Sequence, residues 1–320
     1  MAGHHHHHQL RAHSSFVDSH SSDKHSDDAT GNKSAQCTVT CLYLAKIVGM
    51  SRNVTVVWCK NLINHSLNIT VDCPGNENHY TCKIDFKPWH FWTKKGFKPF
   101  DVEGKRVDIF WDLRSAKFSG SPEPYMDYYV AMVFDEEVVL LLGDYKKKAY
   151  KRTKSRPSLV DAVLVNKKEN VFAKKCFSTR AKFDQRKKDH DIVVENSLLG
   201  PREPEMWVSI DGIVLIHITN LQWKFRGNET VLVNKMPIQV FWDVHDWLFS
   251  TPSGHGLFIF KPGAPEVQED KYAAKESSSV GGETDSTTTV STDEGQLLQN
   301  GDTTSTIPDF SLFLYAWKIE

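Results

Sequence analysis

From Cys37 onward the chain alternates apolar and polar residues with a period of two, the pattern of β-strands that bury one face. The runs are short, rich in β-branched and aromatic residues, and bounded by Gly, Pro, Asn or Asp, as in an all-β protein. The first half contains TVTCLYLAKIV, NVTVVWC, SLNITV, YTCKIDF, KRVDIFWD, DYYVAMVF and EEVVLLLG. The second half contains EMWVSID, IVLIHIT, LQWKF, TVLVN, IQVFWD and GLFIF. The pattern predicts antiparallel sheets, either packed as a β-sandwich or curled into a barrel.

An internal repeat predicts that these sheets form two related halves. Residues 92–118 and residues 223–249 align without a gap at an offset of 131 residues. Seven positions coincide: Trp92 with Trp223, Gly96 with Gly227, Val102 with Val233, Phe110-Trp111-Asp112 with Phe241-Trp242-Asp243, and Phe118 with Phe249. Tryptophan is a scarce residue, so two matched pairs at one offset indicate duplication. The expected halves are residues 37–145 and residues 205–260 with 309–320.

Within each copy the alternation assigns side chains to faces. Val107, Ile109 and Trp111 share one face of the first copy, and Ile238, Val240 and Trp242 share the same face of the second. We expect these faces in the core, and we expect the same of Trp58, Trp92 and Trp223. Asp112 and Asp243 should end their strands by accepting turn hydrogen bonds.

Phe110 and Phe241 fall on the otherwise polar face of the two copies. Two interpretations are open for them. They belong to a second packing layer, or they are aromatic side chains that face a ligand.

Composition sets the limits of the β domain. Residues 1–36 are rich in Ser, His and Asp, and we expect a disordered leader. Residues 261–308 form an acidic tract rich in Ser and Thr, expected to be a disordered insertion. The chain becomes apolar on both faces again at residues 310–319, as a central strand would be. The β domain is therefore predicted to comprise residues 37–260 and 309–320, with one short helix within residues 144–154.

The net charge of −1 hides two opposed blocks. Residues 146–188 carry 16 Lys and Arg against three acids, a balance of +13, and residues 266–309 carry 10 acids against two Lys. The basic stretch is either a solvated loop with Lys-protected strand edges or a surface that binds the phosphates of nucleic acid or anionic lipid. The candidate anion-binding residues are Lys146, Lys147, Lys148, Lys151, Arg152, Lys154 and Arg156.

No catalytic motif emerges from the sequence. It contains no Gly-rich phosphate loop, no Gly-X-Ser-X-Gly and no His-Glu-X-X-His. The close cysteine pairs, Cys37 with Cys41 and Cys73 with Cys82, lack a second pair at zinc-site spacing. We therefore expect no metal and no cofactor. Asp243 and His245 would share a face if the strand continued, but the first copy has no His there.

The start of the chain lacks an apolar core of signal-peptide length, and no run approaches the ~18 apolar residues that span a bilayer. These features predict a cytoplasmic or nuclear protein without a transmembrane segment. Its six cysteines are then expected as reduced thiols.

As a whole the chain resembles the plant family catalogued as domain of unknown function 868. The resemblance runs from Cys37 to Glu320, and long strings carry it: VTVVWCKNL, YTCKIDFKPWHFW, VDIFWDLRSAKF, DYYVAMV with EEVVLLLGD, VFAKKCFSTRAKF, LQWKFRGNET, VFWDVHDWLF and SLFLYAWKIE. It implies a soluble plant protein and confers no activity or catalytic residues. The leader and the insertion lie outside the common fold that it implies.

Together these observations predict a non-enzymatic binding or scaffold protein. Its partner would be a protein, or an anionic lipid or nucleic acid bound through residues 146–188. The alternative is a β-barrel that carries a small apolar ligand, since eight-stranded barrels can enclose one. An enzyme of unrecognised type is the third hypothesis.

Overall fold

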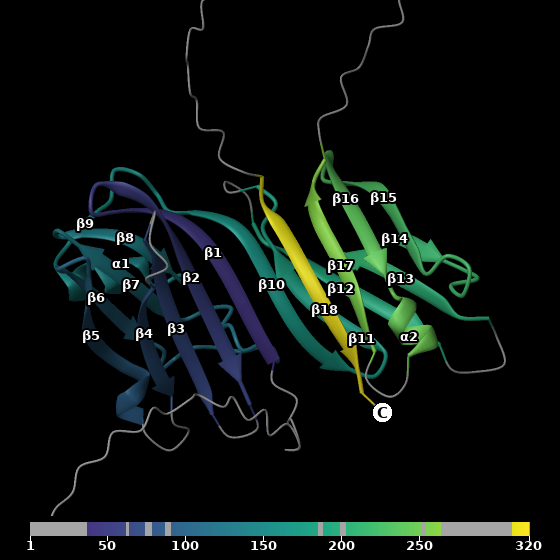
Figure 1. Ribbon diagram of the computed structural model, residues 1–320, viewed down its shortest axis with the longest axis horizontal. Helices are drawn as coiled ribbons and strands as arrows, with labels where there is room; N and C mark the ends of the chain where they lie inside the picture. Colours follow the sequence, from purple (N-terminus) through teal and green to yellow (C-terminus); the bar gives the residue numbers. More distant parts are fainter. Residues whose placement is uncertain are drawn as a thin grey trace, which may run out of the picture. The chain divides into compact units, whose positions relative to one another are not determined.

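The fold consists almost entirely of β-strands, as the alternation predicts (Figure 1). The computed structural model describes residues 37–61, 64–73, 79–86, 91–184, 188–198, 203–250, 254–263 and 309–319. The expected leader and nearly all of the expected insertion lie outside these residues.

Eight strands come from the first half of the chain: β1 Cys37–Ile47, β2 Met50–Lys60, β3 His65–Asp72, β4 His79–Phe86, β5 Lys95–Val102, β6 Lys105–Asp112, β7 Tyr129–Phe134 and β8 Glu137–Leu142. The remaining strands are β9 Arg156–Pro157, β10 Val163–Ala173, β11 Cys176–Ala181, β12 His190–Ser197, β13 Glu205–Ile210, β14 Ile213–Ile218, β15 Arg226–Val233, β16 Met236–Asp243, β17 His255–Pro262 and β18 Ser311–Lys318. The helices are short: η1 Phe91–Lys94, α1 Lys146–Thr153 and α2 His245–Phe249.

These strands form three sheets. A nine-stranded sheet has the order β15-β16-β17-β18-β10-β1-β2-β3-β4, a five-stranded sheet contains β5 to β9, and a four-stranded sheet contains β11 to β14. Pairing is antiparallel except between β10 and β18 and between β8 and β9. Among the described strands the sheets do not close into a barrel, so of the two predicted architectures the sandwich is the one formed.

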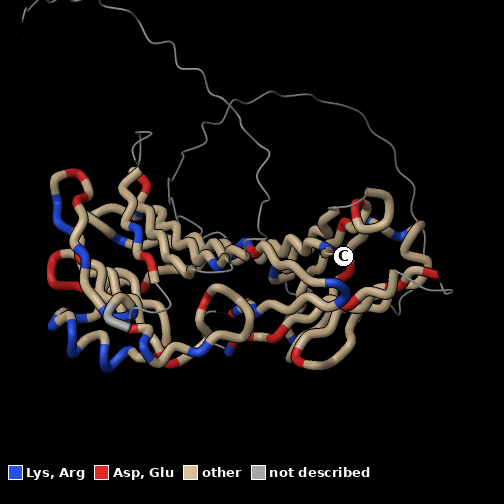
Figure 2. Tube along the Cα trace, turned by 90° about the horizontal axis from the view of Figure 1, so that it is seen from below, with Lys and Arg blue, Asp and Glu red and all other residues tan. Residues whose placement is uncertain are grey.

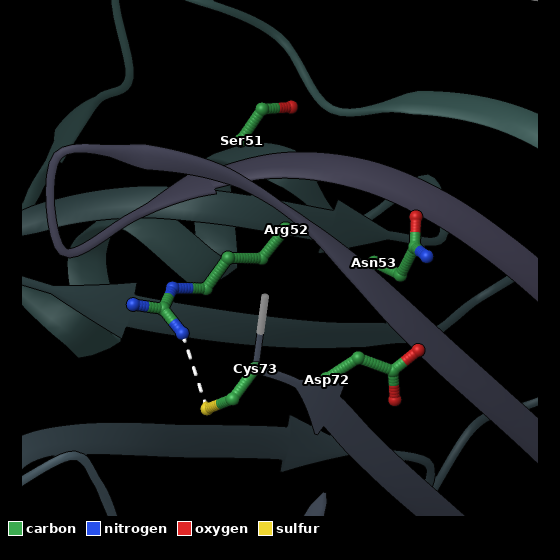
Figure 3. Close-up of a pocket in the computed structure, with 5 residues that line it drawn as sticks. All are labelled: Ser51, Arg52, Asn53, Asp72 and Cys73. Carbon is green, nitrogen blue, oxygen red and sulfur yellow. Dashed lines mark hydrogen bonds between the residues drawn. The ribbon is translucent and has the colours of Figure 1, made fainter. Parts of the chain in front are cut away.

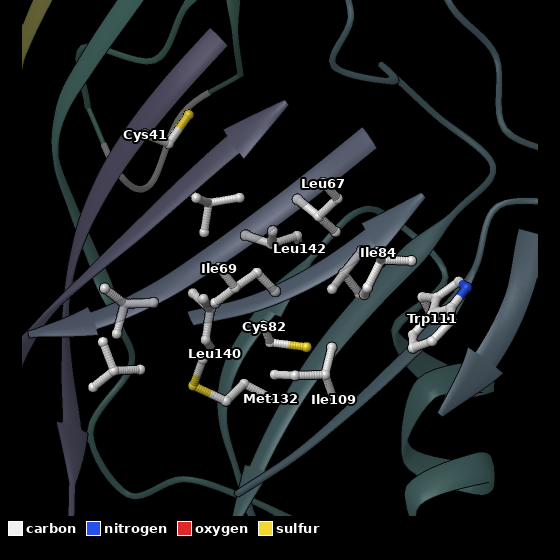
Figure 4. Packing of buried hydrophobic residues seen from close by; sticks show 14 of the residues in the cluster. Cys41, Leu67, Ile69, Cys82, Ile84, Ile109, Trp111, Met132, Leu140 and Leu142 are labelled. Carbon is white, nitrogen blue, oxygen red and sulfur yellow. The ribbon is translucent and has the colours of Figure 1, made fainter. Parts of the chain in front are cut away.

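Each half has its own hydrophobic core. In the first sandwich, β1 to β4 pack over β5 to β8, and Figure 4 shows part of this core, including Ile69, Ile109 and Met132. In the second sandwich, β11 to β14 pack over β15 to β18 around residues such as Ile192, Val240 and Phe258. The nine-stranded sheet contributes to both cores. The second core begins with β11, earlier than the expected start of the second half at residue 205.

The duplicated hairpins have the same local structure although they lie in different sheets. Trp111 Nε1 donates a hydrogen bond to the Thr93 carbonyl at 2.9 Å, and Trp242 Nε1 donates one to the Lys224 carbonyl at 3.0 Å. The hairpin β5–β6 belongs to the five-stranded sheet, whereas β15–β16 forms the edge of the nine-stranded sheet. The duplication that the sequence predicts is therefore present in three dimensions.

The predicted caps at the ends of these hairpins are also present. Asp112 Oδ1 accepts a hydrogen bond from the backbone N–H of Arg114, and Asp243 Oδ1 accepts one from that of His245. The strand therefore ends at Asp243, and His245 belongs to α2 instead of sharing a strand face with it.

The expected burial of tryptophan is correct for Trp58, Trp111 and Trp242 and wrong for Trp223. The first three are at most 8% exposed, whereas Trp223 is 82% exposed. Trp223 lies in the turn before β15, where its backbone N–H donates to the Asn220 carbonyl. Its side chain therefore projects from this turn and not from a strand that faces the core. The nearby Leu221, which is 0% exposed, occupies the core there. The side chain of Trp92 lies outside the described part of the chain.

Candidate anion-binding surface

Helix α1 carries the basic residues that the sequence singles out. The helix packs against β6, β7 and β8 of the first sandwich. Tyr145, Ala149 and Tyr150 face the sheet and join a small apolar cluster. The sheet side of that cluster consists of Phe110, Tyr129, Ala131, Val133, Val138 and Leu141. Because residues three or four apart lie on one side of a helix, the packing of Tyr145 and Ala149 turns the lysines outward.

All seven candidate residues are exposed. Within the described residues Arg156 is the only one of the seven in an ion pair, with Glu137 at 2.8 Å. Lys148 Nζ lies 3.4 Å from the centre of the Tyr145 ring. In Figure 2 the turns of α1 form a dense run of blue. Six cations thus share a short segment without an ion pair among the described side chains, although Lys148 is close enough to Asp127 to help lower the pKa of that carboxyl.

In its first turn the charge of α1 opposes the helix dipole, whereas Lys151 and Arg152 in the last turn favour it. Its first turn carries Lys146, Lys147 and Lys148 and no acid, and Tyr145 at the N-cap makes no side-chain cap hydrogen bond. Cations at a helix N-terminus each cost about 0.3–1 kcal/mol where acids would stabilise it. A bound anion would relieve this repulsion, because the exposed N–H groups and the lysines attract it together.

The rest of the basic stretch does not extend this surface. Lys167 on β10 is 8% exposed and its side chain lies on the buried face of the sheet, whereas the side chain of the adjacent Lys168 is exposed on the outer face. Lys174 and Lys175 lie in the turn that leads to β11, in the second sandwich. Residues 186 and 187 lie outside the described part. The candidate site is therefore limited here to residues 146–156, and a basic surface that covers all of residues 146–188 stays a prediction.

Lys167 is buried because it belongs to an ion-pair network at the boundary of the two cores. Its Nζ lies 3.0 Å from a Glu123 oxygen and 2.7 Å from Glu169 Oε1, and it donates to the Arg180 carbonyl at 3.1 Å. Burial alone would lower the pKa of Lys167, but the two carboxylates outweigh burial and raise its pKa well above the usual value. The lysine is therefore a charged structural residue.

The two phenylalanines on the polar faces have different surroundings. Phe110 lies under α1 in the apolar cluster, with its ring centre 4.8 Å from that of Phe97. Phe241 belongs to none of the three apolar clusters, and Lys261 Nζ lies 5.1 Å from its ring centre. Only Phe241 therefore lies on a face that no described helix covers.

A second charged group, Arg52 with Glu103, lies in the first sandwich, and its hydrogen bonds are made within the protein. The guanidinium of Arg52 contacts Glu103 at 2.6 and 3.1 Å and donates to the Ile47 carbonyl and to Cys73 Sγ. A cavity of about 190 Å³ adjoins it (Figure 3). Burial and the neighbouring Glu103 raise the pKa of the Cys73 thiol despite the guanidinium. A protonated thiol is a poor nucleophile, so this group is structural.

The remaining titratable cluster lies at α2. His245 Nδ1 lies 3.2 Å from Asp246 Oδ1, and His255 Nδ1 lies 3.8 Å from Asp246 Oδ2. The hydrogen bond with His245 is the main cause that lowers the pKa of Asp246. In the described part of the chain no three His, Cys, Asp or Glu side chains are placed to hold a metal ion.

Among the described helices, none has the length and apolar character needed to cross a bilayer.

Comparison with known proteins gives one match. A family model described as "Plant protein of unknown function (DUF868)" matches residues 34–318. No curated protein and no solved structure matches the chain.

Proposed function

We propose that this chain, which belongs to the DUF868 family of plant proteins, is a non-enzymatic binding or scaffold protein that contacts a phosphate-bearing partner through α1. The observation that carries the proposal is the set of six exposed cations on α1 and its flanks without an ion-pair partner among the described residues. Phosphate oxygens would supply the missing negative charge.

Two features of α1 support binding over simple solvation. The helix is anchored through Tyr145, Ala149 and Tyr150, so its cations project from a fixed backbone. Its first turn also concentrates positive charge where the helix dipole disfavours it. A surface selected for stability alone would place acids at those positions.

The test compares binding to two phosphate sources, a fluorescent 20-nucleotide poly-U RNA and vesicles containing phosphatidylserine. The variant is Lys146→Ala, Lys147→Ala and Lys151→Ala, changes that favour the helix. The control is Lys46→Ala, Lys105→Ala and Lys224→Ala, which removes three exposed lysines elsewhere. We expect the α1 variant alone to weaken binding. For RNA, the slope of log K against log salt should fall by about 2, because each lost phosphate contact contributes about 0.7.

Equal loss in the two triple variants would show that only net charge matters and would contradict a site on α1. Binding to neither probe at low salt would contradict phosphate recognition altogether. Preference for one probe decides between nucleic acid and lipid.

A cytoplasmic or nuclear location and an additional protein partner remain part of the proposal. The alternative of an apolar-ligand carrier rested on an eight-stranded barrel, and the described strands form sandwiches without a closed barrel.

A further inference from the structure

The outer face of the second sandwich is apolar where a solvated sheet face would be polar. Phe241 on β16, Ile259 on β17 and Phe313 on β18 are consecutive cross-strand partners. Leu257 and Tyr315 form the next row. All five side chains are half-buried and belong to none of the three apolar clusters. The described residues therefore place no packing layer on this face.

The other end of the same sheet shows the ordinary pattern. There the outward residues are polar, Ser66, Asn68 and Thr70 on β3 and Thr81, Lys83 and Asp85 on β4. One-sided burial normally produces this alternation. On β1 and β2 the outer face is mixed, with Leu42 opposite Thr55 and Val57 opposite Thr40. The apolar row that continues across three strands therefore lies in the second sandwich, which makes it a local feature that needs an explanation.

The duplication shows what covers an equivalent face. Phe110 on β6, Ala131 on β7 and Leu141 on β8 are the matching row in the first copy, with the same strand order and pairing. That row is packed under α1 through Tyr145, Ala149 and Tyr150, and Ala131 is 0% exposed. Phe241 is the counterpart of Phe110 at the repeat offset. A short amphipathic helix is therefore the kind of element that this sheet geometry accepts.

The charged residues beside this face indicate which charge the polar side chains of a docked helix should carry. Lys168 Nζ lies 4.5 Å from the ring centre of Tyr315, and Lys261 Nζ lies 5.1 Å from that of Phe241. The acid on the same face, Asp243 opposite Leu257, is already paired with Arg226 at 2.7 Å. A second copy of this face would bring like charges together, which disfavours self-association. Lys168 and Lys261 also lie over the rings of Tyr315 and Phe241. Nucleic acid bases would need these rings for stacking, so the face is less suited to nucleic acid. Acidic side chains flanking an apolar helix face would pair with the two lysines.

We propose that the outer face of β16, β17 and β18 is a docking site for an acidic amphipathic helix of a partner protein. The helix occupies the place that α1 occupies on the first copy, with apolar side chains on the Phe241–Ile259–Phe313 row and carboxylates toward Lys168 and Lys261. This site is separate from the phosphate-binding surface on α1 and does not depend on it.

The test uses two synthetic 18-residue amphipathic helical peptides with identical Tyr, Ala and Leu positions and either Glu or Lys at the polar positions. Binding is measured on the full chain carrying the three α1 substitutions to alanine, which removes attraction of the Glu peptide to α1. The face variant is Ile259→Thr with Phe313→Thr. The control is Leu42→Thr with Val57→Thr, half-buried residues on the outer face of β1 and β2. Thermal unfolding confirms that each variant folds.

We expect the Glu peptide to bind at least about tenfold more tightly than the Lys peptide, and the face variant alone to lose about tenfold or more. Lys168→Gln with Lys261→Gln should reduce the preference for Glu. Absence of binding, or equal binding by the face and control variants, overturns the proposal.

Three other outcomes assign the face to a different occupant and also overturn the proposal. In the first, poly-U RNA binds through the face and the Glu peptide does not. In the second, sedimentation detects a dimer that the face variant abolishes. In the third, peptide binding requires deletion of residues 265–306, which would make that segment of the chain the natural occupant.

Discussion

Gly96 lies directly across the β5–β6 ladder from Trp111, and a Cβ atom on Gly96 would stand 2.4 Å from Cζ2 of the indole. Gly227 and Trp242 repeat the relationship across β15–β16, with a corresponding distance of 2.3 Å. Carbon atoms in contact need about 3.5–4.0 Å. Each glycine therefore provides the space into which its partner indole folds, and this explains why the two residue types coincide in both copies.

Gly227→Ala should destabilise the protein by about 1–3 kcal/mol through overpacking. Elsewhere the same substitution at a compatible backbone position stabilises by about 0.4–1 kcal/mol, so the sign is diagnostic. The measurement is urea unfolding of the variant and the unsubstituted protein. In a Trp242→Phe background the smaller ring should relieve the contact and shrink the cost. The same cost in both backgrounds would refute the steric explanation.

Trp242→Ala should destabilise by about 3–5 kcal/mol, because it removes a buried aromatic side chain and leaves a cavity. Trp223→Ala should change stability by no more than about 0.5 kcal/mol, because its side chain is 82% exposed. Thermal unfolding of the two single variants checks both values. Similar losses in the two variants would place Trp223 in the core after all.

Lys167→Met should destabilise by about 3–5 kcal/mol, because it leaves the carboxylate of Glu169 buried without its cation. Glu169 is 2% exposed, so water cannot replace the lysine readily. The exposed neighbour Lys168→Gln is the control, with an expected change of about 0.5 kcal/mol or less. Adding Glu169→Gln to Lys167→Met should recover part of the loss, and a double variant that loses still more would argue against an uncompensated charge.

The stability that the Arg52–Glu103 ion pair contributes should be lost at acidic pH. The hydrogen bonds from the Arg52 guanidinium lower the pKa of the Glu103 carboxyl. A lowered pKa means that this contribution is complete above the unfolded carboxyl pKa of about 4.3 and is lost as pH falls through the folded pKa. The melting temperatures of the unsubstituted protein and Glu103→Gln should therefore differ near pH 7 and converge as the pH falls from about 4.3 through the lowered pKa of Glu103. A constant difference across that range would show that the ion pair does not titrate with folding.

The strands were predictable because each reads as a local alternation. In β6 and β16 the buried apolar residues, including Trp111 and Trp242, stand at every second position of the strand. Hairpin turns also have local signals: Asp211-Gly212, a dipeptide typical of two-residue hairpin turns, has positive φ angles between β13 and β14. Helix α1 falls inside the predicted segment 144–154.

Strand β10 shows where local patterns fail. Lys167 and Glu169 point inward where an apolar residue would be expected, so the central strand of the nine-stranded sheet reads as a charged connector. Its parallel pairing with β18 joins segments far apart in the chain, and no local signal encodes such a register. Helix α2 is only five residues long and carries little periodicity.

The candidate surface was predictable in part for the same reason. A run of lysines marks α1 directly, whereas Lys167 in the same basic stretch is buried by partners from other segments, including Glu123. The apolar outer face of the second sandwich could have been read from residues 310–319, which are apolar at nearly every position. Only the structure shows that one side of that strand packs into a core and the other does not.

The pairing of β18 between β10 and β17 also dictates an order of events during biosynthesis. Strands β1 to β8 form a contiguous block, so the first sandwich can assemble while the ribosome is still translating the rest. The second cannot: until residues 311–318 have emerged, β10 and β17 each expose an unpaired backbone edge. The unpaired edges of β10 and β17 therefore remain exposed while the ribosome translates the acidic tract that precedes β18.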